Sequence, residues 1–237
     1  MALQAARELL ENAAGSLPAA ILAALPSGFY DYLVTGGLRI DHVDPQRMLC
    51  SITVPHRLLS HGGVLDNGVT ASLVDIIGSA AFFAAGCPTT GVSVDISISY
   101  LEAAYADWAM GGKTRTRAAP EEAVDLQVLK SFLEKAAADS VPEAALPSKF
   151  FDNFIVRGIR IDHVDPRRVL CSMALPPLLL NNGNFLDSGA VASLVDIMGS
   201  AALFAAGYPT TGVSTDINIS YLDAAHVDVS ITPYSVS

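Results

Sequence analysis

The stretch that decides the fold is residues 68–86, GVTASLVDIIGSAAFFAAG, and residues 189–207, GAVASLVDIMGSAALFAAG, nearly repeat it. Both stretches are small or apolar on almost every side, and each holds one carboxylate, Asp75 or Asp196. A helix that is apolar all round is buried in a core or a membrane. Burying an ionised acid costs several kcal/mol unless the acid is partnered or protonated. Both acids are therefore candidate site residues, with structural acids capped by nearby hydroxyls as the alternative.

The composition of the 237-residue chain is that of a folded acidic protein. Hydrophobic residues make up 51% and charged residues 16%, which is typical of a globular core. The length allows one large domain or two of about 120 residues. A net charge of -10 argues against a nucleic-acid partner or an anionic membrane surface, since both attract basic proteins.

The cysteines and the motifs that the sequence lacks indicate the compartment and the kind of chemistry to expect. Cys50, Cys87 and Cys171 form no CxxC pair, which favours a reducing compartment. We expect a cytoplasmic protein, with organellar targeting left open. The sequence contains no phosphate-binding glycine loop, no nucleophile elbow and no Cys/His metal spacing. We therefore expect no cofactor and no metal.

The two apolar stretches also raise the question of a membrane, because they approach spanning length. Each, however, has an acid near its middle, at about 2.5–3.5 kcal/mol on an insertion scale, and neither has a basic flank. The N-terminal segment has acids early and lacks a basic region followed by an apolar core, so it does not resemble a signal peptide. We expect no membrane span.

An internal repeat governs the organisation of the chain. Residues 25–105 align without a gap to residues 146–226. For example, FYDYLVTGGLRIDHVDP in the first copy aligns with FFDNFIVRGIRIDHVDP in the second. Two copies are too few to stack into an array, so we interpret them as a tandem duplication. The expected modules are residues 1–119, with an N-terminal helix, and residues 120–237.

Each copy predicts the same elements. In the first copy, residues 38–54 alternate on both sides of an Asp-Pro turn, which indicates a strand, a turn and a strand. A loop rich in Gly and Asn leads to the apolar helix, which we expect to stop at Gly86 before a proline. Residues 92–100 then alternate as a strand. Helical lead-ins are expected at residues 5–25 and 124–137.

The pattern resembles a known family. Each copy has ASLVD and, eighteen residues after its Asp, the serine of GVS-x-D-I-x-I-S-Y. This resembles the hotdog fold of the thioesterases and is most similar to the phenylacetate-type enzymes and their acyl-coenzyme A thioesterase 13-like branch. The resemblance implies an α+β fold: two tandem hotdog-like modules, each with an antiparallel sheet wrapped on a buried helix. Residues 102–119 and the C-terminus leave room for one strand each, so the late strands of that family are expected to be missing.

The resemblance also implies a catalytic site. In that family the acid at the positions of Asp75 and Asp196 is the general base or the nucleophile. The serine at the positions of Ser93 and Ser214 helps to hold the attacking water. An asparagine fifteen residues before the acid orients substrate or water, and Asn181 stands at that distance from Asp196.

This chain departs from the family pattern around the helix starts. Fifteen residues before Asp75 stands Ser60 instead of asparagine. Where the family has a histidine, followed by a glycine whose N–H contacts the thioester oxygen, both copies have an acid. These acids are good helix caps, yet as carboxylates they would repel an oxyanion. The substrate-binding residues expected here are Asp66, Asn67, Gly68, Asp187, Ser188 and Gly189.

Related hotdog dimers combine the asparagine loop and helix start of one subunit with the acid and serine of the other. We therefore expect strands 90–101 and 211–222 to lie adjacent and antiparallel, and each site to mix the two copies. Because only Asn181 keeps the family's asparagine, we expect the site of Asp75 to carry most of the activity. Exposed sheet edges are expected to favour self-association.

Two functions are compatible with these residues. The first is an acyl-coenzyme A thioesterase with an Asp base or nucleophile and oxyanion donors at a helix N-terminus. The second is a catalytically inactive hotdog relative that binds acyl chains or acts as an assembly partner. Asn181 favours the enzyme, whereas Asp66 and Asp187 favour the inactive relative.

Overall fold

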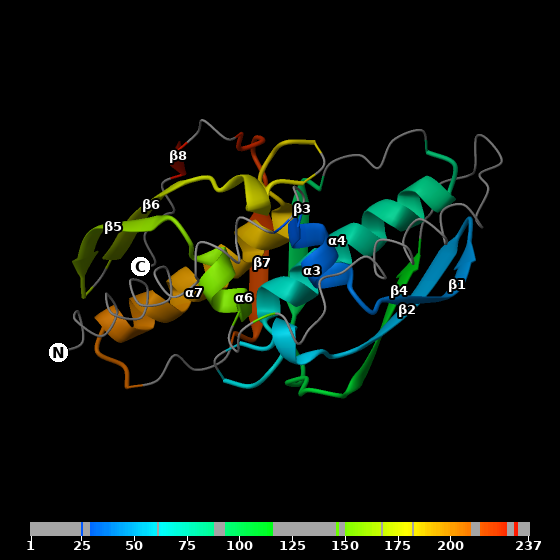
Figure 1. Ribbon diagram of the computed structural model, residues 1–237, viewed down its shortest axis with the longest axis horizontal. Helices are drawn as coiled ribbons and strands as arrows, with labels where there is room; N and C mark the ends of the chain where they lie inside the picture. Colours follow the sequence, from blue (N-terminus) through cyan, green and yellow to red (C-terminus); the bar gives the residue numbers. More distant parts are fainter. Residues whose placement is uncertain are drawn as a thin grey trace.

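The chain forms an α+β structure whose two apolar helices meet at its centre (Figure 1). A computed structural model describes residues 25, 29–60, 62–87, 93–115, 146, 150–166, 168–181, 183–209, 214–226 and 230–231. The predicted lead-in helices, residues 5–25 and 124–137, lie outside the described residues apart from Leu25. The division into modules 1–119 and 120–237 stays a prediction.

The central helices are α4 (Asn67–Ala84) and α7 (Ser188–Ala205), and they pack against each other. Gly86 and Gly207, just beyond their ends, have positive φ angles of 87° and 93°, as expected for glycines that stop a helix. The expected helix and its glycine stop are therefore confirmed in both copies.

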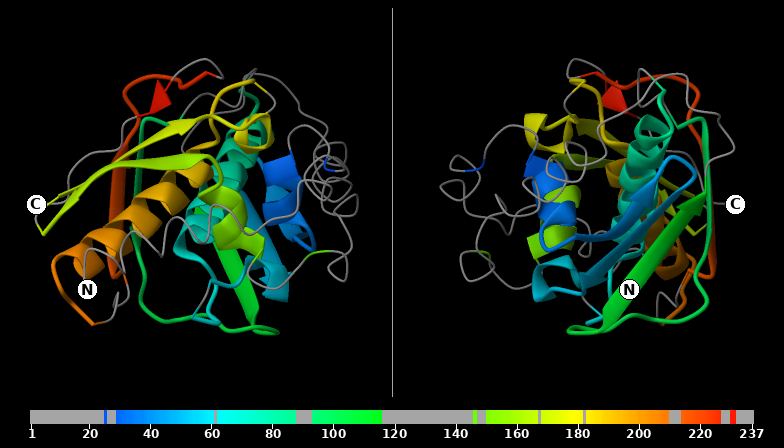
Figure 2. Two further views of the ribbon diagram at one scale, coloured as in Figure 1. Left: turned by 60° about the vertical axis from the view of Figure 1, so that its left-hand side comes forward. Right: turned by 90° about the vertical axis from the view of Figure 1, so that its right-hand side faces the viewer.

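The sheets around these helices are antiparallel. Two three-stranded sheets, with strand orders β1-β2-β4 and β5-β6-β8, lie on either side of a two-stranded sheet, β3-β7 (Figures 1 and 2). The predicted strand-turn-strand of residues 38–54 is present as β1 and β2, so that prediction is confirmed. The strands are β1 (Arg39–Asp44), β2 (Arg47–Thr53), β3 (Asp95–Ser99), β4 (Ala109–Arg115), β5 (Ile159–Asp165), β6 (Arg168–Ala174), β7 (Asp216–Ser220) and β8 (Ser230–Ile231).

Strand β3 of the first copy pairs with β7 of the second. The pairing is antiparallel and centred on Ser97 opposite Asn218, so the expected contact between the two repeat strands is confirmed. The polar faces of these strands are joined across the pair, for example by the Ser99 hydroxyl, which donates to Asp216 at 2.6 Å. Within the described residues each copy has one further strand, which pairs with the strand just before the central helix. In the first copy β4 pairs with β2, and in the second β8 pairs with β6.

Two short helices that the repeat did not predict bring the copies together. They are α3 (Phe29–Thr35) and α6 (Phe150–Ile155), the equivalent segments of the two copies. The Phe29 ring lies 5.5 Å from that of Phe154, edge to face. Phe29 and Phe154 are fully buried and belong to one hydrophobic core that also holds residues of α4 and α7. One-turn 3₁₀ helices, η1 (His56–Leu58) and η3 (Pro177–Leu179), follow β2 and β6.

The expectation that the central helices are buried on all sides is wrong for one face. Val74 and Phe82 of α4 are 46% and 50% exposed. The sheets cover only part of each helix, and about half of each helix is buried. By length and composition α4 and α7 could cross a membrane, although core helices pass the same test. The expected absence of a membrane span stays a prediction.

Candidate active site

Asp75 lies on α4 with a serine hydroxyl on each of its carboxylate oxygens. The Ser93 hydroxyl, just before β3 in the same copy, donates to Oδ1. The Ser188 hydroxyl, on the first residue of α7 in the other copy, donates to Oδ2 at 2.5 Å. Asp75 is only partly buried, so it loses only part of its hydration. Two hydroxyl groups donate hydrogen bonds to its carboxylate oxygens in place of water.

Asp196 occupies the equivalent place on α7, with different neighbours. The Ser214 hydroxyl donates to its Oδ1, as Ser93 does to Asp75. The residue from the opposite helix start is Asn67, whose Nδ2 lies 3.4 Å from both carboxylate oxygens. The structure thus brings each predicted acid together with its predicted serine and with the helix start of the other copy.

Each acid meets the helix start of the other copy because α4 and α7 cross closely. Gly68 faces Ser193 so tightly that a Cβ on the glycine would lie 2.4 Å from the Ser193 Cα. Gly189 faces Ser72 in the same way, at 2.5 Å from the Cα. Only glycine permits such an approach of two helices. Ser72 and Ser193 lie three residues before the two acids, so each helix start reaches the acid of the other helix.

The buried hydroxyl of Tyr30 completes the crossing. It lies 2.5 Å from the Ser72 hydroxyl and also bonds the Ser193 hydroxyl, so one side chain of α3 ties both helices together. Burial raises the pKa of Tyr30 well above its usual value, and the nearby charge of Asp187 adds to the effect. Tyr30 therefore stays a neutral hydrogen-bonding group.

Asp66 and Asp187 are helix caps, as the sequence predicts. Asp66 Oδ1 accepts from the Gly68 N–H at 2.8 Å, and Asp187 Oδ1 accepts from the Gly189 N–H at 2.8 Å. Both side chains are buried. The structure places them at the helix starts, which leaves their assignment as substrate-binding residues a prediction.

Burial raises the pKa of both cap carboxyl groups above that of an ordinary aspartate. Burial, helped by the charge of Asp31, raises the pKa of Asp187 to about 8. Burial also raises the pKa of Asp66 well above its usual value, with the charges of Asp152 and Asp196 adding to it. A protonated carboxyl does not repel an oxyanion, so the repulsion expected from the sequence is relieved by burial.

Two tyrosines of the site were missed from the sequence, which assigns them to the core. The Tyr100 hydroxyl donates to the Asn67 carbonyl, and the Tyr221 hydroxyl to the Ser188 carbonyl, both at 2.8 Å. Burial raises the pKa of both, with the charge of Asp196 acting on Tyr100 and that of Asp75 on Tyr221. Their shared place as the last letter of GVS-x-D-I-x-I-S-Y is the signal that could have found them.

Asn181 and Ser60 lie in the loops before the helix starts. Asn181 Oδ1 accepts from the Gly183 N–H at 2.8 Å, within its own loop. The Ser60 N–H donates to the Val64 carbonyl, also at 2.8 Å and also locally. Among the described residues, no hydrogen bond joins either side chain to Asp75 or Asp196. The catalytic role expected for Asn181 stays a prediction.

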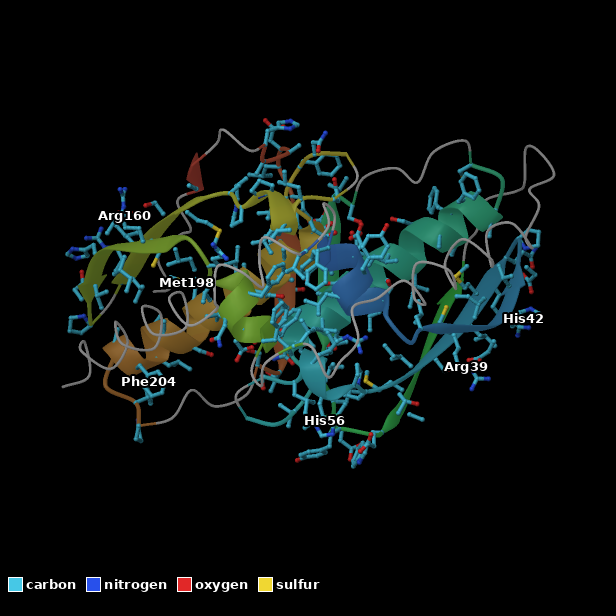
Figure 3. All side chains as sticks on the ribbon, viewed as in Figure 1. Arg39, His42, His56, Arg160, Met198 and Phe204 are labelled. Carbon is cyan, nitrogen blue, oxygen red and sulfur yellow. The ribbon has the colours of Figure 1, made fainter. Side chains whose placement is uncertain are left out.

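Other polar groups lie away from this centre. Arg39 and His42 on one outer hairpin and Arg160 on the other lie at opposite ends of the molecule (Figure 3). His42 Nε2 lies 2.7 Å from Asp44 Oδ2 on its own hairpin. Within the described ranges, no group of three His, Cys, Asp or Glu side chains could hold a metal ion.

The part of the chain that contains this centre matches a family model. Residues 62–111, which include α4, Asp75 and Ser93, match the model of the thioesterase superfamily. Over these residues the chain is similar to the thioesterase superfamily. The hotdog thioesterase resemblance of the sequence is therefore confirmed, while the tandem arrangement of two modules stays a prediction.

Two known proteins are similar to part of this chain. A Schizosaccharomyces pombe protein provisionally named an esterase is 38% identical over 74 residues, 31% of this chain and 46% of that protein. Mouse acyl-coenzyme A thioesterase 13 is 35% identical over 60 residues, 25% of this chain and 43% of the mouse protein. The chain thus spans less than half the length of each.

A solved structure is also similar. The crystal structure of zebra fish thioesterase superfamily member 2 covers 77% of this chain and 88% of the fish protein, at 15% identity and a TM-score of 0.31. The likeness is too loose for a residue-by-residue comparison.

Proposed function

We propose that this chain is an acyl-coenzyme A thioesterase. The observation that carries the proposal is the meeting of acid, serine and opposite helix start: Asp75 with Ser93 and Ser188, repeated in the other copy. It is supported by the thioesterase match of residues 62–111. A carboxylate next to a serine hydroxyl and the N-terminus of the opposite helix offers a base and oxyanion donors to one thioester.

The proposed reaction uses only groups of the chain and one water. The carboxylate of Asp75 or Asp196 accepts a proton from the water as its oxygen attacks the thioester carbon. The first backbone N–H of the opposite helix, that of Ser188 or Asn67, stabilises the oxyanion that forms on the carbonyl oxygen. The intermediate collapses, the C–S bond breaks, and the thiolate of coenzyme A takes the proton from the acid.

The cap Asp187 suits this reaction because burial raises its pKa to about 8, so that it is protonated near pH 7. A second carboxylate next to the developing oxyanion would oppose it, whereas a neutral carboxyl does not. If the activity test fails, the chain is the catalytically inactive relative considered from the sequence.

The test measures thiol release from a panel of acyl-coenzyme A esters with a thiol reagent. We expect turnover by the full chain and its loss in the Asp75→Ala, Asp196→Ala double variant. Asp95→Ala is the matched control, because Asp95 is an exposed acid of β3 whose Oδ1 only accepts a hydrogen bond from Ser220. Equal rates in the chain and the double variant, with equal melting temperatures, would exclude the function.

We further propose that the enzyme acts in the cytoplasm and self-associates through exposed sheet edges. The outer strands β1 and β4 each have a partner on one side only within the described residues. Such edges favour pairing with another chain. Light scattering on the purified chain tests the assembly, and a single species of monomer mass would contradict it.

A further inference from the structure

The two acids of the centre differ in the residue that the opposite helix start presents to them. Asp75 faces Ser188, whereas Asp196 faces Asn67. Each acid also accepts a hydrogen bond from a serine of its own copy, Ser93 for Asp75 and Ser214 for Asp196. This exchange of serine for asparagine is a difference in the groups that bond the two carboxylates directly.

On Asp75 both carboxylate oxygens are taken by hydroxyl groups. Ser93 donates to Oδ1, and Ser188 donates to Oδ2 at 2.5 Å. Hydroxyl-to-carboxylate bonds of about 2.5–2.7 Å are among the strong hydrogen bonds of proteins. A water that uses Asp75 as its base must compete with these two hydroxyl groups for the remaining lone pairs of the carboxylate. The Ser188 hydroxyl therefore hinders Asp75 from acting as a base.

On Asp196 the second contact is weaker. Asn67 Nδ2 lies 3.4 Å from both oxygens, outside the usual range of about 2.7–3.2 Å for such a bond. Within the described residues, the only hydroxyl that bonds this carboxylate is that of Ser214, on Oδ1. An amide can donate to one group and accept from another, so Asn67 can orient a water against Oδ2.

The amide that meets an acid is thus supplied by a helix start. The sequence-based expectation gave Asn181 the task of orienting substrate or water at Asp75; its Oδ1 accepts from the N–H groups of Gly183 and Phe185 in its own loop. The position next to Asp196 is held because the Asn67 carbonyl accepts the Tyr100 hydroxyl at 2.8 Å. This bond fixes the backbone of Asn67, and its half-buried side chain starts from that fixed point.

We propose that Asp196 is the working base of the thioesterase, that Asn67 orients its attacking water, and that the Ser188 hydroxyl closes Asp75. This rests on the proposed function and reverses the expectation that the Asp75 site predominates. The chain then has two similar acids but one main site for an acyl thioester.

The experiment compares kcat and KM for thiol release from one acyl-coenzyme A ester. We expect Asp196→Asn to lower kcat about a hundredfold, at least tenfold more than Asp75→Asn does. Asn67→Ala is expected to lower kcat with little change in KM, because orienting water matters only during the reaction. Ser188→Ala is expected to raise kcat, by up to about twofold, since it frees a second acid; a further Asp75→Asn change then removes the gain. Asp95→Asn is the unchanged control.

Two results would overturn the inference while leaving the thioesterase intact. One is a greater loss with Asp75→Asn than with Asp196→Asn at equal stability. The other is a fall in kcat with Ser188→Ala, which would make its hydroxyl a participant. If the chain hydrolyses no ester, calorimetry with an S-alkyl coenzyme A thioether still decides. One molecule bound per chain, with similar affinity in Asn67→Ala, supports the inference, whereas two or none contradicts it.

Discussion

At the residue scale, Asp187 shows how burial changes what an acid does. Its side chain is 5% exposed, and its Oδ1 accepts from the first N–H groups of α7. Asp31 of α3 hydrogen-bonds to it, and two carboxyl groups can share such a bond only when one of them is protonated. Charged or polar groups that face Asp187 are Asp31 and Tyr30 of α3, Asp75 of α4 and Tyr221 after β7.

We expect this acid to make the chain less stable as the pH rises. The pKa of Asp187 is raised from 3.8 to about 8 in the folded protein, so the folded state binds the proton more tightly than the unfolded state. Stability is then highest below pH 3.8 for this group and falls progressively until about pH 8. Urea unfolding at pH 5, 6, 7 and about 8.5 measures the slope.

The variant that isolates this effect is Asp187→Asn, which keeps a cap and removes the titration. We expect it to flatten the pH dependence between pH 5 and 8. Asp44→Asn is the control, because its hydrogen bond with His42 lowers the pKa of Asp44, which then titrates below this window. An unchanged slope in Asp187→Asn would show that the proton lies elsewhere.

At the element scale, the crossing of α4 and α7 depends on two glycines and not on the helices' apolar character. A Cβ at Gly68 or Gly189 would lie 2.4 or 2.5 Å from a backbone Cα of the other helix. That contact cannot be relieved by turning a side chain, so the helices would have to separate. The same separation would withdraw each helix start from the acid that it faces.

We therefore expect Gly68→Ala and Gly189→Ala to destabilise the chain by about 1–3 kcal/mol or more. Gly78→Ala and Gly199→Ala are matched controls within the same helices, because a Cβ there meets nothing within 4 Å. These controls should stabilise the helices by roughly 0.5–1 kcal/mol, the usual gain of alanine over glycine. Thermal melting of the four variants checks the contrast, and equal effects within each helix would contradict the crossing.

At the scale of the whole molecule, the two copies share one core. The larger cluster of buried side chains contains Phe29 and Tyr30 from the first copy and Phe151 and Phe154 from the second. Strands β3 and β7 also pair between the copies. A core and a sheet that both cross the repeat boundary predict that neither copy is stable without the other.

We expect the chain to unfold in one cooperative step despite its repeat. Trp108, the only tryptophan, reports on the first copy by fluorescence, and thiol labelling of buried Cys171 reports on the second. The two denaturant midpoints should coincide, and Phe29→Ala should shift both by the same amount, corresponding to about 3–5 kcal/mol. Two separate transitions, or a shift in the Trp108 transition alone, would show two independent units.

Much of the local structure could be predicted from the sequence. The alternation of residues 38–54 predicted β1 and β2, and the Asp-Asn-Gly and Asp-Ser-Gly signals predicted the starts of α4 and α7. These features are local, because alternation and helix capping depend on neighbours within a few residues. The short helices α3 and α6 were missed, since segments of 7 and 6 residues are too brief for a helical period to show.

The residues that face each acid were decided by the tertiary structure. The sequence by itself determined that Asp75 and Asp196 stand in apolar helices and that a serine follows each by eighteen residues. Which polar group completes each centre depends on how closely α4 and α7 cross, and that distance is set by Gly68 and Gly189 against serines about 120 residues away in the chain. No periodicity records such a contact, because it joins residues of different copies. For that reason the contact of the Asn67 side chain with Asp196 was not predicted from the sequence.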